Sequence, residues 1–334
     1  MLIPSKEHFA GCLIGQCLGD ALGFPVEGYP RSVCSRYVEE LKAGASPQGR
    51  YPFPFGQYTD DSQLARELMI SIVERGEFDP ARYADRIREM FSHHRVVGGG
   101  RATTQAALRL AQGVPWEKSG TPRPSAGNGS AMRAGPIGLF FFDDPGALTL
   151  AAHDQGRITH TDSRCSAGAV AIACSVAQAL QGDQIVPHRF LGTISNLAKK
   201  IDPSVAQAVE HLDGCVALEP HDAFETLARK GYVPEYSDDW LGITPFVTGS
   251  VMWSIYAFLK NTSSYLNTIH TAIAVGGDVD TTSAMAGAIS GAYLGLEAIP
   301  PALAEHITDQ GEWGIHELKN LAYSLYDLKV RSLV

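Results

Sequence analysis

The chain has 334 residues, a mass of 35.9 kDa and an apolar fraction of 45%, which is ordinary for a globular protein with a sizeable core. Its 27 basic and 36 acidic residues give a net charge of −9 with no basic block, so neither nucleic acid nor an anionic membrane is an expected partner. The N-terminus lacks the basic and then apolar order of a signal peptide, and the six cysteines form no CxxC pair, so we expect a cytoplasmic protein with reduced thiols.

Residues 9–23 predict a helix that carries a stripe of glycines, and residues 283–295 repeat the same spacing. Glycine costs a helix about 1 kcal/mol relative to alanine, so such a stripe needs a packing reason. We expect the two helices to pack at very close range in the centre of the fold. The stripes consist of Gly11, Gly15, Gly19 and Gly23 in the first segment and Gly287, Gly291 and Gly295 in the second. Their pairing would bring Asp20 and Glu27 near Asp278 and Asp280.

The rest of the chain also has helical periodicity, and alternating strand patterns are nearly absent. Residues 28–54 are rich in turn-forming residues and predict a long surface loop. Helices are expected over residues 61–75, 80–91, 103–111 with Thr103 as N-cap, 134–142, 147–153, 165–180 and 249–260, with several short ones between 185 and 231. The sequence therefore predicts an all-α, compact single-domain bundle of many helices over residues 1–334, whose polar helix entrances converge on one central cleft.

Two clusters of hydroxyls and paired carboxylates stand at predicted helix entrances, in Thr59-Asp60-Asp61-Ser62 and in Asp278-Val279-Asp280-Thr281-Thr282. Carboxylates brought together in a cleft repel each other, so the duplication favours a shared cation. Neither cluster contains Cys or His, which makes Mg²⁺ or Mn²⁺ a better candidate than Zn²⁺. The alternative is that these side chains only cap the helices that follow them.

Two glycine-rich segments are candidates for binding a ligand. Gly98-Gly99-Gly100 permits close approach of the backbone to a ligand, but it can equally be a flexible connector. Gly127-Asn128-Gly129 can expose successive N–H groups that cradle phosphate, with Arg133 or the following helix N-terminus adding positive potential. His160 is either a ligand contact or a core histidine with satisfied hydrogen bonds.

Taken together, five ordered motifs resemble the ADP-ribosylglycohydrolase family. They are Gly19-Asp20-Ala21-Leu22-Gly23-Phe24-Pro25-Val26-Glu27, Thr59-Asp60-Asp61-Ser62, Gly127-Asn128-Gly129-Ser130-Ala131-Met132-Arg133, Thr159-His160 and Gly277-Asp278-Val279-Asp280-Thr281. The resemblance covers roughly residues 8 to 300. It implies an all-helical fold with two Mg²⁺ or Mn²⁺ ions in a cleft, and a hydrolase that cleaves the glycosidic bond at ribose C1 of an ADP-ribosylated protein or small molecule and releases ADP-ribose.

The resemblance also implies roles for individual residues. Thr59, Asp60 and Asp61 would bind one metal, Asp278 and Thr281 the other, and Asp280 would bridge them. Glu27 would contact the second metal or the scissile ribose, and Glu27 or a cluster aspartate, Asp60 or Asp280, would take part in catalysis. Substrate contacts are expected from Glu27, Gly99, Gly100, Ser125, Ala126, Gly127, Asn128, Gly129, Met132 and His160.

The sequence departs from the family pattern at Gly98-Gly99-Gly100, where the nitrogenase-linked and arginine-specific members carry an aspartate. The group linked to ADP-ribose is therefore open between arginine, a serine oxygen, an acetyl ester and a small molecule. Two other functions remain as alternatives, a two-metal phosphoesterase or pyrophosphatase and a non-catalytic ADP-ribose binding protein. We expect a monomer.

Overall fold

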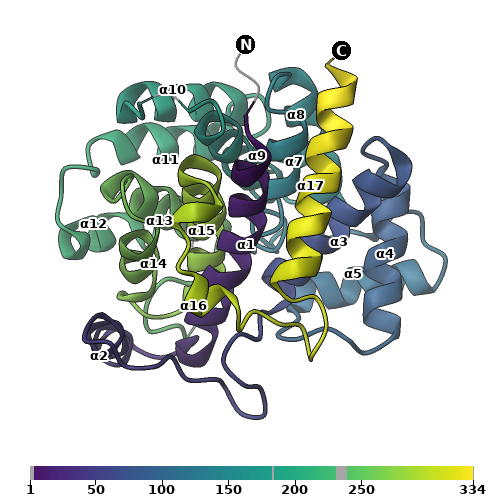
Figure 1. The fold of residues 1–334 in the computed structure, drawn as a ribbon. Coiled ribbons are helices and arrows are strands. Elements are labelled where there is room, and N and C mark those ends of the chain that lie inside the picture. The colour runs from purple at the N-terminus through teal and green to yellow at the C-terminus, as the bar shows by residue number, and fades with distance from the viewer. Residues whose placement is uncertain (1–3, 183, 231–238, 334) are drawn as a thin grey trace.

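The computed structural model of the chain describes residues 4–182, 184–230 and 239–333 (Figure 1). Within these ranges it contains seventeen α-helices, two short 3-10 helices and isolated β-bridges but no β-strand, which confirms the all-α prediction. The helices are α1 (Lys6–Gly23), η1 (Phe24–Val26), α2 (Arg31–Lys42), α3 (Asp60–Arg75), α4 (Pro80–Ser92), α5 (Arg101–Ala111), α6 (Trp116–Ser119), α7 (Gly135–Phe140), α8 (Pro145–Arg157), α9 (Ser163–Ala179), α10 (Pro187–Ala198), α11 (Pro203–Asp213), α12 (Pro220–Leu227), α13 (Val247–Lys260), α14 (Tyr265–Ile273), α15 (Val279–Leu294), η2 (Leu296–Ala298), α16 (Pro301–Ala304) and α17 (Ile315–Ser332).

Helices α1 and α15 lie side by side in the middle of the molecule (Figure 1). Their backbones touch along the glycine stripes. A Cβ atom added to Gly11 would lie 2.3 Å from the carbonyl oxygen of Gly291, and one added to Gly15 would lie 2.6 Å from that of Gly287. Because any larger side chain would hold the helices apart, the glycines are what permits this approach, and the predicted pairing is confirmed.

Residues Lys6–Val26 have a mean hydropathy of 1.3 and are long and apolar enough to cross a membrane by length and composition alone. In the structure, 94% of that window is buried inside the protein. The apolar character of this segment is accounted for by its place in the core, where both sides of α1 contact other helices.

Other helices surround the central pair and position the site. Helix α15 also packs against α9, α13 and α14, and α1 packs against α17 and α3. The ring of Phe9 in α1 meets that of Tyr326 in α17 edge-on, with centroids 5.4 Å apart. As a result, the N-termini of α3 and α15 lie beside the C-terminal half of α1, and this is where the acidic motifs meet.

The structure corrects two sequence-based predictions. Residues 28–54 are not a continuous loop, because α2 occupies Arg31–Lys42 and buries Cys34 and Val38, which are spaced i, i+4 on one helix face. The prolines that suggested a loop flank α2 and do not interrupt it, and residues 43–59 contain no helix. Helix α5 begins at Arg101 with Gly100 as N-cap, so Thr103 lies inside the helix and does not cap it.

Candidate metal centre

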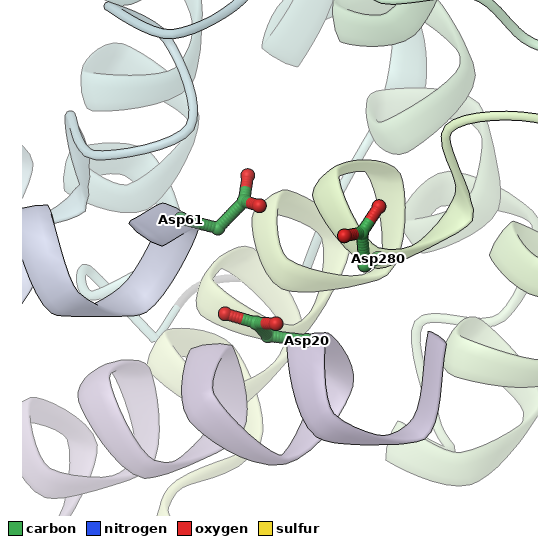
Figure 2. A group of neighbouring side chains, drawn as sticks. All are labelled: Asp20, Asp61 and Asp280. Atoms are coloured by element: carbon green, nitrogen blue, oxygen red, sulfur yellow. The ribbon is translucent and has the colours of Figure 1, made fainter. Parts of the chain in front are cut away.

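Carboxylates from the two acidic motifs and from the region around the end of α1 converge on one place. Oxygens of Asp20, Asp61 and Asp280 lie within 4.8 Å of one another, and so do oxygens of Glu27, Asp278 and Asp280. Figure 2 shows the first group, with one residue each from α1, α3 and α15. Asp280 belongs to both groups, and it is the residue to which the family resemblance assigns a bridging role. The predicted approach of Asp20 and Glu27 to the Asp278 motif is confirmed.

Hydroxyl groups of the two motifs orient these carboxylates. Thr59 Oγ1 lies 2.8 Å from Asp61 Oδ2 and 3.0 Å from Asp20 Oδ1, and Thr59 also caps α3. Thr281 Oγ1 donates to Asp278 Oδ1 at 2.9 Å, and the Thr281 N–H donates to Asp280 Oδ1 at 2.9 Å. Both threonines predicted as metal ligands therefore lie in direct contact with the candidate ligand oxygens.

Asp60 lies beside these groups and belongs to neither of them. Its backbone N–H donates to the carbonyl of Val97 at 2.7 Å, and its Oδ2 accepts a long 3.4 Å hydrogen bond from the N–H of Gly100. Asp60 is buried but lines the cleft together with Glu27 and Asp61. The structure thus places this predicted ligand next to the glycine loop, where its carboxylate faces both the loop and the cluster.

Asp20 is the ligand candidate that the sequence-based list of metal residues left out. It is fully buried and accepts hydrogen bonds from the N–H of Thr59 at 3.0 Å and from the N–H and hydroxyl of Ser62 at 3.1 and 2.7 Å. Asp20 thereby ties the N-terminus of α3 to α1. Its place one residue after Gly19 in the glycine stripe was the signal that pointed to it.

The electrostatics of the cluster favour a bound cation. Burial, followed by the charges of neighbouring carboxylates, raises the pKa of Asp60 to about 7 and that of Asp278 to about 6. The same two causes raise the pKa values of Asp61 and Asp280 well above their ordinary range. Asp61 Oδ1 is buried and has no hydrogen-bond partner among the described residues. An all-oxygen donor set with an unsatisfied buried carboxylate oxygen fits a hard divalent cation.

The carboxylates open into a cleft of about 560 Å³. The predicted substrate-contact residues Ser125, Ala126, Gly127, Asn128, Gly129, Met132 and His160 line it together with Glu27, Asp60, Asp61, Gly98, Gly100, Arg101, Ala102, Thr103, Pro124, Trp240, Pro245, Asp278, Asp280 and Thr281. Gly99, in contrast, lines a neighbouring pocket with Phe91 and Leu108, so only Gly98 and Gly100 of this loop face the cleft.

The Gly127-Asn128-Gly129 loop lines the same cleft as the carboxylates and is hydrogen-bonded to one of them. Asn128 Nδ2 donates to Asp278 Oδ2 at 2.6 Å and to Ser250 Oγ at 3.2 Å, so this side chain orients a carboxylate. The backbone N–H groups of Gly127 and Gly129 have no acceptor among the described residues. Both residues line the cleft, and their role in binding an anionic ligand stays a prediction.

His160 lines the cleft, whereas Arg133 does not. A Cβ atom on Gly129 would lie 2.8 Å from His160 Cε1, so the imidazole packs directly against the backbone of the loop. Burial and the charge of Arg133 lower the pKa of His160 to about 3, and the ring is therefore neutral. Arg133 itself is fully buried and donates to Gln155 Oε1 at 2.8 Å and to Thr159 Oγ1 at 2.9 Å. Arg133 does not line the cleft, but its charge acts to lower the pKa values of the cleft residues Asp60 and His160, so it adds positive potential there without lining the cleft itself.

With this geometry established, comparison with known proteins identifies the family. A sequence model described as ADP-ribosylglycohydrolase matches residues 2–332. The chain belongs to the ADP-ribosylglycohydrolase family. This agrees with the resemblance of the five motifs, and the match covers nearly the whole chain.

Relatives of this ADP-ribosylglycohydrolase family chain come from distant organisms. It is 30% identical to ADP-ribosylhydrolase ARH3 of Xenopus tropicalis, over 95% of this chain and 97% of that protein. It is 26% identical to ADP-ribosylarginine hydrolase Tri1 of Pseudomonas putida, over 96% of this chain and 78% of that protein. A solved structure titled ADP-ribosylglycohydrolase-related protein complex superimposes with a TM-score of 0.71 and 26% identity, covering 97% of this chain and 98% of the other.

Several cleft residues were not predicted to contact a ligand, and Trp240, Pro245 and Arg101 are three of them. Trp240 and Pro245 carry no ionisable group, so their residue types gave no signal for a metal or phosphate contact. Arg101 follows the three glycines directly and is the one lysine or arginine among the described lining residues. Because Gly98-Gly99-Gly100 was already a candidate ligand-binding segment, the position of Arg101 beside it could have predicted a ligand contact.

Proposed function

We propose that this chain is a metal-dependent hydrolase that cleaves the glycosidic bond at ribose C1 of an ADP-ribosylated protein or small molecule and releases ADP-ribose. One observation carries the proposal: two groups of carboxylate oxygens, from α1, α3, α15 and the residues that flank η1 and α15, share Asp280 and open into the same cleft as the Gly127-Asn128-Gly129 loop. A carboxylate centre suits cations that hold sugar hydroxyls, and a loop with free N–H groups suits phosphate. Family membership supports the same assignment.

The two oxygen groups would hold two Mg²⁺ or Mn²⁺ ions, with Asp280 common to both. When bound, such ions supply Lewis-acid polarisation of water and of the ribose hydroxyls. The residues of the chain contribute the rest. Glu27, whose pKa is raised by burial, accepts the proton of the attacking water. Asn128 keeps Asp278 oriented, and the N–H groups of Gly127 and Gly129 bind the diphosphate, which orients ribose C1.

We further propose that the bond cleaved at C1 joins ribose to an oxygen atom. A guanidinium leaving group needs a carboxylate partner at the mouth of the cleft. The loop from Gly98 to Arg101 carries no carboxylate, and Arg101 would repel a second guanidinium. A serine oxygen or an acetyl ester meets no such repulsion. ADP-ribosyl-arginine is accordingly expected to be the poorer substrate.

Hydrolysis of a small panel tests the proposal. ADP-ribosyl-serine, O-acetyl-ADP-ribose, ADP-ribosyl-arginine and α-NAD are incubated with the protein in Mg²⁺, in Mn²⁺ and in EDTA, and the products are separated. Metal-dependent release of intact ADP-ribose from an oxygen-linked member is the expected result. Release of AMP would instead indicate cleavage at phosphorus, and binding of ADP-ribose without turnover of any member would indicate a binding protein.

A further inference from the structure

Arg50 contacts Glu27, one of the carboxylates that line the cleft. It belongs to the stretch 43–59, which contains no helix. Arg50 Nη1 donates to Glu27 Oε2 at 2.6 Å and to the carbonyl oxygen of Phe24 at 3.0 Å. Its guanidinium also lies over the ring of Phe24, 5.1 Å from the centroid. Arg50 is therefore fixed by η1 at two points and holds Glu27 with the same group.

Glu27 differs from the other carboxylates of the centre in how it is held. Asp20 and Asp61 accept from Thr59, Asp278 accepts from Asn128, and Asp280 accepts from the backbone of Thr281 (hydrogen bonds of 2.6–3.0 Å). These donors all belong to the motifs of the site itself. The side chain of Glu27, in contrast, accepts from Arg50 alone among the described residues.

The position of Glu27 needs such a restraint. A carboxylate oxygen of Glu27 lies within 4.8 Å of oxygens of Asp278 and Asp280. Like charges at this distance repel, and Glu27 is only partly buried, with 26% of its side chain exposed. It also follows a 3-10 helix of three residues, which gives it less support than a long helix would. Without a cationic partner, the side chain is free to turn toward solvent.

We propose that Arg50 is a positioning residue that holds the Glu27 carboxylate beside Asp278 and Asp280, so that Glu27 is ready to act on the metal-bound substrate. This inference rests on the proposed function for the role of Glu27. Arginine suits the task because its planar guanidinium donates to Glu27 and to a backbone carbonyl while it stacks on an aromatic ring. Lysine can supply the charge but not the stacked, two-point geometry.

The test compares Arg50→Ala, Arg50→Lys, Glu27→Gln and the double variant Arg50→Ala/Glu27→Gln. Binding of Mn²⁺ to each is measured by calorimetry in the absence of substrate, and kcat and KM are measured on the best member of the panel. Loss of a group that orients a ligand carboxylate commonly reduces metal affinity or activity by about 10- to 100-fold. We expect Arg50→Ala to lower kcat and Mn²⁺ affinity by about tenfold or more, with KM changed less than about threefold, and Arg50→Lys to recover part of the loss.

The double variant separates positioning from a general effect of charge. If Arg50 acts through Glu27, adding Arg50→Ala to Glu27→Gln causes little further loss, because residues that act as a unit are not additive. Arg36→Ala, which removes an arginine 73% exposed on α2 and paired with Glu40, is the matched control and should change neither measurement. The Arg50 side chain is 39% exposed, so its pair with Glu27 adds little to folding stability and the variants are expected to fold.

Three results would overturn the proposal. The first is additive losses in the double variant, and the second is an Arg50→Ala protein whose kcat and Mn²⁺ affinity both stay within about threefold of wild type. The third is tighter Mn²⁺ binding after Arg50→Ala, which would mean that Arg50 competes with the metal. The proposed function can fail separately. If the wild type binds Mn²⁺ but hydrolyses no member of the panel, the proposed function falls, while the Mn²⁺ affinities still decide the role of Arg50. A wild type that binds no Mn²⁺ would overturn both.

Discussion

The contact between α1 and α15 predicts a large cost for adding a single methyl group at Gly291. A Cβ atom there would lie 1.9 Å from the carbonyl oxygen of Gly11 and 2.6 Å from its carbonyl carbon, both of which are backbone atoms that cannot turn away. Non-bonded contacts are optimal near 3.5 Å, so the helices would have to separate by roughly 1.5 Å at this point. That separation also loosens the neighbouring contacts between the two helices.

Overpacking a core costs about 1–3 kcal/mol and occasionally more, and opening a gap of 0.5–1 Å forfeits about a quarter to a half of each contact that lines it. The better helix propensity of alanine returns about 1 kcal/mol. Because both clashing atoms belong to the backbone, the cost lies at the upper end of that range, and we expect Gly291→Ala to lower the free energy of unfolding by about 2 kcal/mol. Because α1 and α15 carry Asp20 and Asp280, the variant should also bind Mn²⁺ more weakly.

The matched control is Gly192→Ala in α10, where an added Cβ atom meets nothing within 4 Å. This change should stabilise the protein by about 0.5–1 kcal/mol, through helix propensity alone. Urea unfolding followed by circular dichroism measures both variants, and the m-value checks that the transition itself is unchanged. A loss below about 1 kcal/mol for Gly291→Ala, with an unchanged m-value, would refute the argument that the two backbones touch.

Three further predictions concern the cleft. Asp280→Ala should lower kcat by about a hundredfold, or roughly 3 kcal/mol of barrier, and a loss under about threefold in a folded protein would contradict a shared ligand role. Arg101→Ala should weaken binding of ADP-ribose, measured by calorimetry, while leaving binding of uncharged adenosine unchanged; an equal effect on both would exclude a phosphate contact. In the metal-free protein, burial raises the pKa values of Asp20 and Asp60 from 3.8 to about 7, so between these values the folded state binds more protons than the unfolded state. Its stability should therefore fall as pH rises from about 4 to about 7, and saturating Mn²⁺ should remove that loss; thermal melts at pH 5.5 and 8 that show no such metal dependence would contradict the cluster.

The central helix pair and much of the site could be predicted from sequence because their signals are local. A glycine every fourth residue marks a helix face that must meet another backbone, and hydroxyl–carboxylate motifs at helix entrances mark oxygen ligands. Pairing the two stripes was enough to predict that Asp20 and Glu27 lie near Asp280, and the structure confirms it. The near-absence of alternating strand patterns was also sufficient to predict the all-α class, which the structure confirms.

Other parts of the site depend on partners that lie far away in the chain. Arg133 sits in the candidate phosphate loop, yet its Nε and Nη2 atoms donate to Gln155 and Thr159, and the side chain does not line the cleft. Asn128 stands between two glycines, a pattern typical of a turn, but its side chain donates a hydrogen bond to Asp278, which is 150 positions away. Nothing in the local pattern distinguishes a polar side chain that faces a ligand from one that holds a neighbouring residue.

The sequence by itself thus determined the all-α class, the close pairing of α1 with α15 and the carboxylates available to a metal, because each follows from the period or spacing of residues within one segment. The tertiary structure decided that residues 31–42 form a helix against the core, that Asp20 ties α1 to α3, and that Arg50 holds Glu27. These outcomes depend on which atoms of distant segments come within hydrogen-bonding distance. The packing of whole helices sets that distance, so no local sequence pattern predicts it.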